Sequence, residues 1–170
     1  MHIKERCAMD NREFIDRTIR RYEKYINPSL AKLMRFMGLD TIEWQAEGYI
    51  IRDISGKEYI DCLGGYGVFS LGHRHPRVIA AVKRQLDYMP LSSKILFNKL
   101  TAELAELLAE ITPGDLQYSF FGNSGTEAVE GALKLARVHT GRQKVISTVN
   151  AFHGKTFGAL SATGRDLFRE

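Results

Sequence analysis

The passage from residue 117 to residue 149 constrains the fold of this chain more than any other. Its pattern indicates a short apolar and aromatic strand at Tyr118–Phe121, a glycine-containing loop, a helix at Ser124–His139 and a second strand at Lys144–Val149. A strand–helix–strand unit of this kind requires parallel strands and a right-handed crossover. Because parallel sheets are covered by helices on both faces, two strands are too few, and we expect part of a larger α/β sheet that is unfinished at Glu170.

Periodic apolar residues predict four more helices and a hairpin. The helices are Asn11–Ile26, Leu30–Met37, Pro76–Tyr88 and Asn98–Ile111. The hairpin joins Tyr49–Ile51 to Glu58–Ile60 through the turn-forming segment Asp53–Lys57. We therefore expect a helical and hairpin region before the α/β region.

The loop Gly122–Glu127 joins the first of the predicted strands directly to a helix. Free N–H groups of the first helical turn and the positive end of the helix dipole converge on such a loop, and Ser and Thr hydroxyls add donors, so a phosphate group would be well held. Alternatively, Ser124 only caps the helix, and Glu127 three residues later completes a capping box. Such boxes are common, so the loop alone leaves both interpretations open.

A second loop, Ala151–Thr156, follows the second predicted strand. It would lie at the carboxyl end of a parallel strand beside the phosphate loop, where open α/β sheets bind their ligands. Phe152 could stack on a flat cofactor ring there and Lys155 could meet an anion. For a lone aromatic residue, however, ordinary packing is the more common role.

Composition excludes several classes of protein. The net charge is +4, but 24 basic residues are spread among 20 acidic ones, which does not favour nucleic-acid binding. The N-terminal segment has no apolar core of a secretory signal, and no stretch is apolar enough to span a membrane. Cys7 and Cys62 lie far apart, and His73-Arg74-His75 has no further ligand at metal-binding spacing. We expect a soluble cytoplasmic protein without metal, nucleic-acid or membrane partners.

Together these motifs resemble the class III, ornithine-type aminotransferases of the fold type I group, which depend on pyridoxal 5'-phosphate. Asn123–Ala128 followed by Ala132–Arg137 is similar to the family's phosphate-binding turn and helix, and Ala151–Gly154 to its ring-stacking motif. Leu71–Pro76 is similar to the start of its large domain. The resemblance is closest to the putrescine subgroup, through the segments Glu43–Ala46, Ile60–Gly67 and Tyr118–Phe121.

The resemblance implies an architecture and a set of site residues. The implied fold class is α/β, with a three-layer α/β/α large domain around a mostly parallel sheet. This chain would be the incomplete N-terminal portion of such a fold type I aminotransferase. Residues 1–72 would form an N-terminal helical extension and hairpin that belong to the small domain, and residues 73–170 the first part of the large, cofactor-binding domain. The cofactor-binding residues would be Ser124, Gly125, Thr126, Phe152 and His153, and the substrate-binding residues Tyr66 and Lys155.

The resemblance also implies an activity, which is transfer of an amino group from a diamine or ω-amino donor to 2-oxoglutarate by a homodimer. The acetylornithine branch carries Arg where this chain has Lys155, and loss of a bidentate clamp for a carboxylate favours a putrescine-like donor. The lysine that forms the Schiff base is expected downstream of Glu170, so these residues alone are predicted to be inactive. An acetylornithine or ornithine aminotransferase, another fold type I enzyme and a non-catalytic gene fragment remain alternatives.

Overall fold

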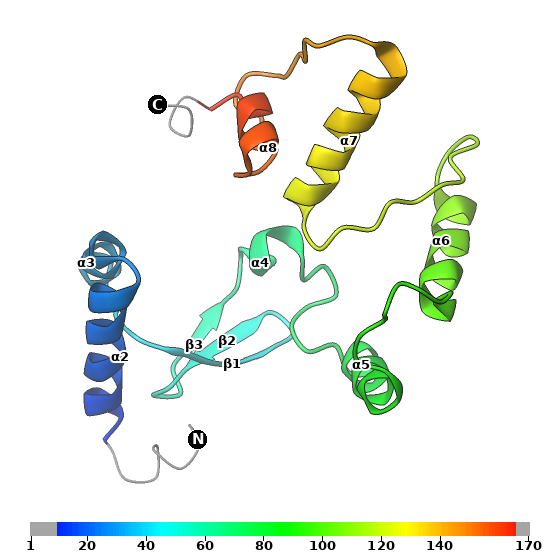
Figure 1. The fold of residues 1–170 in the computed structure, drawn as a ribbon. Helices are drawn as coiled ribbons and strands as arrows, with labels where there is room; N and C mark the ends of the chain where they lie inside the picture. Colours follow the sequence, from blue (N-terminus) through cyan, green and yellow to red (C-terminus); the bar gives the residue numbers. More distant parts are fainter. Residues whose placement is uncertain (1–9, 166–170) are drawn as a thin grey trace. The chain divides into compact units, whose positions relative to one another are not determined.

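The structure, a computed structural model, describes residues 10–165 in two compact units (Figure 1). Unit 1 is Met1–Leu91 and unit 2 is Ser92–Glu170. The predicted absence of a secretory signal and the position of Cys7 concern residues 1–9, which lie outside the described part. The predicted domain boundary after residue 72 concerns the two domains that the resemblance implies, and this division of the chain does not test it. Within residues 10–165, no helix is both long and apolar enough to cross a lipid bilayer.

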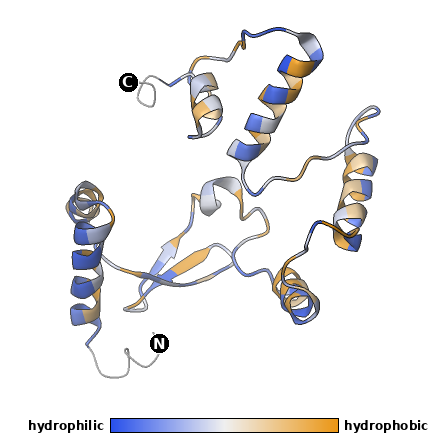
Figure 2. Ribbon diagram, viewed as in Figure 1, coloured by the Kyte–Doolittle hydropathy of each residue, from blue (hydrophilic) through white to orange (hydrophobic). Residues whose placement is uncertain are grey.

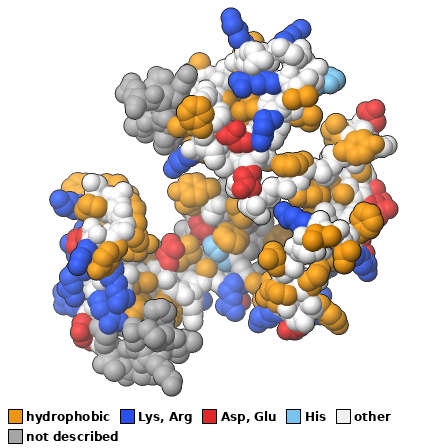
Figure 3. All heavy atoms as spheres, in the orientation of Figure 1, with side chains coloured by type: hydrophobic (Ala, Val, Ile, Leu, Met, Phe, Trp, Pro, Cys, Tyr) orange, Lys and Arg blue, Asp and Glu red, His pale blue; other side chains and the backbone are white. Residues whose placement is uncertain are grey.

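The described part of unit 1 begins with two helices, which confirm the predicted ones. Helix α2 spans Asn11–Tyr25 and helix α3 spans Pro28–Phe36. The side chain of Asn27 caps α3 by accepting hydrogen bonds from the N–H groups of Ser29 and Leu30 at 3.0 and 3.1 Å, and proline at the first helical position suits this start. Lys and Arg side chains gather over α2 with acidic residues among them (Figure 3), as expected of a solvated helix face.

A three-stranded antiparallel sheet follows, in the order β1-β2-β3. Strand β1 is Glu43–Glu47, β2 is Ile50–Asp53 and β3 is Glu58–Ile60. The pairing of Ile50 with Ile60 and of Ile51 with Tyr59 confirms the predicted hairpin. Strand β1 was not predicted, because its sequence EWQAE lacks apolar alternation and four of its five residues are exposed.

The turn between β2 and β3 is organised by the buried carboxylate of Asp53, which is 5% exposed. Its Oδ1 accepts hydrogen bonds from the N–H and hydroxyl of Ser55 and from the N–H of Lys57, at 2.6 to 3.0 Å. Its Oδ2 accepts from the hydroxyls of Thr41 and Tyr59 at 3.1 and 3.2 Å. These donors, with the Ser55 hydroxyl foremost, outweigh the effect of burial and lower the pKa of Asp53 to about 2.

The glycine-rich passage after β3 forms a short helical turn, α4, at Gly64–Gly67. Tyr66 lies in this turn with a left-handed φ of 58°, a conformation that residues other than glycine adopt only when their surroundings hold them in it. Helix α5, Pro76–Tyr88, then matches the predicted helix at both ends. Backbone hydrogen bonds join His73 to Gly48 in both directions, at 2.7 and 3.0 Å, which ties this passage to the sheet.

Unit 2 contains three helices among its described residues, α6 at Lys99–Ile111, α7 at Gly125–Thr140 and α8 at Phe157–Ala162. Helices α6 and α7 confirm the predictions to within one residue at each end, and α8 was not predicted. Hydrophobic and hydrophilic positions alternate along α6 (Figure 2), and its apolar residues, such as Leu100 and Leu104, are 50% and 46% exposed. Helix α7 ends at Thr140, because the following Gly141 has a left-handed φ of 68° that stops the helix.

The two strands predicted in unit 2 are absent from the described residues. Tyr118–Phe121 and Lys144–Val149 have no ladder partner, and Tyr118 and Ile146 are each 99% exposed. A strand exists only when its N–H and C=O groups bond to a neighbour. Among the described residues, neither segment pairs with the other or with another strand, although the carbonyl of Thr148 accepts a local hydrogen bond from the N–H of Ala151. Only the helix of the predicted strand–helix–strand unit is therefore formed.

Replacement of Asp53 by asparagine should destabilise unit 1. An amide keeps one acceptor but turns an NH2 group toward hydroxyl donors, which should cost on the order of 2 kcal/mol at about pH 7. Because the pKa of Asp53 falls from 3.8 to about 2 on folding, the ionised carboxylate stabilises the fold above about pH 4, and this contribution is lost as the pH falls toward 2.

Urea unfolding of Asp53→Asn at several pH values, followed by circular dichroism, measures this difference. The control is Asp40→Asn, an exposed aspartate. A deficit for Asp53→Asn that stays constant from about pH 7 to about pH 3 would contradict the assignment.

Candidate functional site

The first turn of α7 has the geometry of an anion-binding site. Ser124 is the N-cap, with extended backbone, and its Oγ accepts a hydrogen bond from the N–H of Glu127 at 3.3 Å. The carboxylate of Glu127 accepts from the N–H of Asn123, one residue earlier than in a standard capping box. Ser124 therefore caps the helix as predicted, but Glu127 does not complete the predicted capping box, and the cap does not use up the donors of the turn.

Two N–H groups of this turn remain available. Those of Gly125 and Thr126 donate to no acceptor among residues 10–165. A Cβ added at Gly125 would meet no atom within 4 Å, so the space on the side-chain side of this residue is open. Two converging N–H groups at the start of a 16-residue helix, beside the Ser124 hydroxyl, suit the phosphate of a cofactor.

The second predicted loop lies against this turn. The hydroxyl oxygens of Thr126 and Thr156 are 2.7 Å apart. Gly154 is buried with a φ of 131°, and a Cβ at that position would collide with the Thr126 side chain. The N–H of His153 donates to the hydroxyl of Thr163 at 3.1 Å. The structure thus brings together the two loops that the sequence assigned to the cofactor.

The side chains of the second loop differ in exposure. Phe152 is 51% exposed, so about half of its side chain is accessible to solvent. Lys155 is exposed and His153 is half-buried. All the predicted cofactor residues, and Lys155, therefore lie in unit 2 on two adjoining loops.

Glu130 is a site residue that the sequence analysis did not recognise. Glu130 and Lys134 are four residues apart on α7, which is the spacing of an ion pair on a helix, but no such pair within 4.0 Å forms among the described residues. Its Oε1 instead accepts hydrogen bonds from the Thr156 hydroxyl at 2.6 Å, the Gly158 N–H at 2.8 Å and the Ala159 N–H at 3.1 Å. The Thr156 hydroxyl, followed by the Ala159 N–H, lowers the pKa of Glu130 below its usual value. The partners lie 26 to 29 residues away, which no local pattern could reveal.

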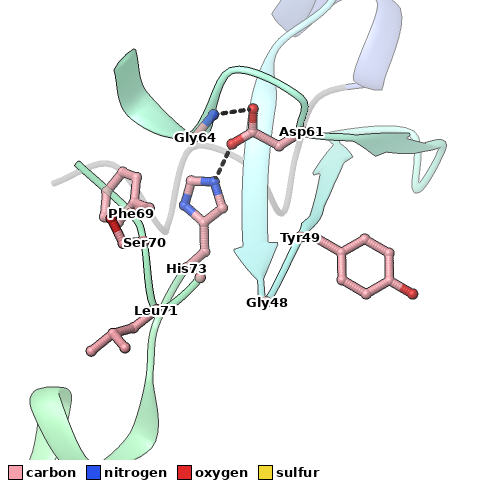
Figure 4. A pocket seen from close by; sticks show the side chains of 9 residues that line it. Gly48, Tyr49, Asp61, Gly64, Phe69, Ser70, Leu71 and His73 are labelled. Atoms are coloured by element: carbon pink, nitrogen blue, oxygen red, sulfur yellow. Dashed lines mark hydrogen bonds and ion pairs between the residues drawn. The ribbon is translucent and has the colours of Figure 1, made fainter. Parts of the chain in front are cut away.

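Tyr66, the other predicted substrate residue, belongs to unit 1, where its side chain is 88% exposed. The structure does not test its predicted role. Near it in sequence, a cavity of about 350 Å³ is lined by Asp61, Phe69 and His73 but not by Tyr66 (Figure 4).

In this cavity the Nε2 of His73 lies 2.7 Å from Oδ2 of Asp61. The other oxygen of Asp61 accepts from the N–H groups of Leu63 and Gly64 at 2.8 and 2.9 Å. These contacts, with the His73 hydrogen bond foremost, lower the pKa of Asp61. The pair joins the two ends of the glycine-rich passage and thereby fixes the backbone around Tyr66.

Comparison with known proteins identifies the family. The sequence profile of the class-III aminotransferases matches residues 39–169. The putrescine aminotransferase of Pectobacterium atrosepticum is 49% identical over 156 residues, which cover 87% of this chain and 33% of that protein. The chain thus spans about a third of the length of this relative.

Solved structures give the same result. An (S)-enantioselective ω-transaminase from Thermomicrobium roseum matches with a TM-score of 0.81 and 28% identity, over 96% of this chain and 38% of that one. A taurine:2-oxoglutarate aminotransferase from Bifidobacterium kashiwanohense, solved with PLP and glutamate, matches with a TM-score of 0.73 and 32% identity, over 76% and 29%. These likenesses confirm the predicted fold class, of which the described elements are a part. The chain belongs to the class-III aminotransferases, a family of fold type I enzymes that depend on pyridoxal phosphate.

Proposed function

We propose that the full-length protein transfers an amino group from a diamine such as putrescine, or from another ω-amino donor, to 2-oxoglutarate. The main support is the first turn of α7, where two N–H groups and a hydroxyl converge beside the loop that carries Phe152 and Lys155. The likeness to a putrescine aminotransferase and to ω-transaminases supports a donor whose reacting amine is terminal.

In this proposal Ser124, Gly125 and Thr126 bind the phosphate of pyridoxal phosphate, and Phe152 packs on its ring with His153 beside it. The bound cofactor supplies an electron sink for bond cleavage next to the amine nitrogen. The protein holds it at one end through the positive end of α7, and the second loop fixes the orientation of the ring.

Lys155 and Tyr66 are proposed to contact the substrate. A lysine ammonium is a compact point charge and cannot clamp a carboxylate with two parallel hydrogen bonds as arginine does. Lys155 would therefore select less strongly for an α-amino acid. We further propose that the full-length protein is a cytoplasmic homodimer whose partners are small molecules and neither nucleic acid nor membrane.

Donor preference tests this function directly. The full-length protein, loaded with pyridoxal phosphate, should show a kcat/KM for putrescine at least about tenfold above that for N-acetylornithine, which equals about 1.4 kcal/mol in transition-state binding. The rate of glutamate formation from 2-oxoglutarate measures both kcat/KM values. Lys155→Arg should lower the ratio of kcat/KM for putrescine to that for N-acetylornithine. Lys144→Arg, outside the proposed site, should leave this ratio unchanged. Preference for N-acetylornithine would favour the acetylornithine alternative.

The 170 residues by themselves are expected to form no glutamate from putrescine and 2-oxoglutarate. The family's reaction needs a lysine that the resemblance assigns to a segment beyond these residues. A comparison of the purified 170-residue chain with the full-length protein, at equal concentration and with excess cofactor, measures this. Turnover that persists through repeated purification from host enzymes would show that the chemistry needs no such lysine.

Replacement of Gly154 by alanine should weaken cofactor binding. The added Cβ would displace the Thr126 side chain and separate the two loops, so we expect the Kd for pyridoxal phosphate to rise roughly tenfold or more. Absorbance titration of the full-length apoprotein measures this. The matched control is Gly141→Ala, which also has a left-handed φ but has no atom within 4 Å of an added Cβ. An equal loss in both variants would show backbone strain as the cause.

A further inference from the structure

Three side chains of unit 2 form a continuous hydrogen-bonded series. The hydroxyls of Thr126 and Thr156 are 2.7 Å apart, and that of Thr156 donates to Oε1 of Glu130 at 2.6 Å. Thr126 and Glu130 lie one turn apart on α7, whereas Thr156 is the N-cap of α8. The series therefore connects the proposed phosphate turn to the end of the second loop.

The direction of each hydrogen bond in this series follows from the chemistry of its last member. An ionised carboxylate can only accept, and each hydroxyl has one proton to donate. Because Thr156 gives its proton to Glu130, the oxygen of Thr156 can only accept from Thr126. The proton of the Thr126 hydroxyl is thus committed to Thr156, and only lone pairs of that oxygen remain for other partners.

The direction of these hydrogen bonds determines which groups could bind a phosphate. A fully ionised phosphate needs donors, and the Thr126 hydroxyl has none to spare. The remaining donors are the N–H groups of Gly125 and Thr126 and the hydroxyl of Ser124, whose oxygen accepts from Glu127 and whose proton is given to no acceptor in the described part of the chain.

We propose that Thr126, Thr156 and Glu130 form a positioning relay, in which the Thr126 hydroxyl holds the second loop against α7 instead of donating to the cofactor phosphate. The proposal rests on the proposed function in its reference to the phosphate, but the relay itself does not depend on a bound cofactor. Glu130 is its anchor, because the same oxygen also receives the N–H groups of Gly158 and Ala159 at the start of α8.

The packing around the relay is built for this close approach. A Cβ on Gly158 would collide with the carboxylate of Glu130, and one on Gly154 would collide with the hydroxyl of Thr126. The second loop and the start of α8 can approach α7 this closely only because these two positions lack side chains. Loss of any relay member should therefore release the same segment, residues 151–159.

Amide hydrogen exchange of the full-length protein without cofactor tests the relay. Thr126→Val, Thr156→Val and Glu130→Gln should each speed exchange in α8, by up to roughly tenfold, the effect of about one hydrogen bond. Thr126→Ser and Thr156→Ser keep the hydroxyls and should retain protection, which separates the relay from a general loss of folding. Thr140→Val, at the other end of α7, is the matched control and should leave α8 unchanged.

A double-mutant cycle on the Kd for pyridoxal phosphate provides the second measurement. If the Thr126 hydroxyl acts through Glu130, Thr126→Val should add no further loss in a Glu130→Gln background. A full additional loss of affinity in that background would show direct donation to the phosphate and overturn the proposal, as would unchanged α8 exchange in Thr126→Val. Failure of the protein to bind pyridoxal phosphate would refute the proposed function instead, and the exchange measurement would still decide the relay.

Discussion

The carboxylate of Glu130 joins two parts of unit 2 that are separated by 26 to 29 residues in sequence. One oxygen receives a hydroxyl and two N–H groups, which satisfies donors at the start of α8 that would otherwise be left without partners. Since the hydroxyl belongs to Thr156, the same oxygen also fixes the end of the loop that carries Phe152. The proximity of the two candidate site loops depends on this one group more than on apolar packing, because few side chains in unit 2 are buried.

Unit 1 uses carboxylates in a comparable way. Asp53 gathers donors from both sides of a turn, and Asp61 joins its own loop to His73 across 12 residues. Both have lowered pKa values because they accept several hydrogen bonds, which is a structural cause and not a sign of acid–base catalysis. In both units, an acidic side chain accepts several hydrogen bonds from a glycine-containing segment and thereby holds the backbone of that segment in place.

Local features of the sequence predicted local structure well. Pro76 and the apolar spacing after it gave the limits of α5, and Ser124 with Glu127 gave the start of α7. The proposed phosphate turn could be located for the same reason, since N-cap, glycine and helix are adjacent in sequence. The position of the second loop beside it was predicted from the carboxyl ends of two parallel strands, and the resemblance to a family indicated the same pair of loops.

Features that depend on distant partners could not be predicted. Glu130 appears in sequence as one half of an ordinary i,i+4 pair, and its actual partners become apparent only after the chain has turned back. The predicted strands at Tyr118–Phe121 and Lys144–Val149 were read from apolar composition, but a strand also needs neighbours, and none is provided by the described residues. Strand β1 is the opposite case. Its own sequence has little strand character, and it forms a strand because it pairs with β2.

Two glycines of unit 2 should tolerate almost no substitution. Gly158 faces the Glu130 carboxylate, and a Cβ on Gly164 would collide with the backbone oxygen of Thr148. Neither residue carries a functional group, yet any side chain at either position would push apart segments that must touch. Random mutagenesis should therefore find few tolerated replacements at these two positions, and sequence drift should be slower there than at the exposed Lys155.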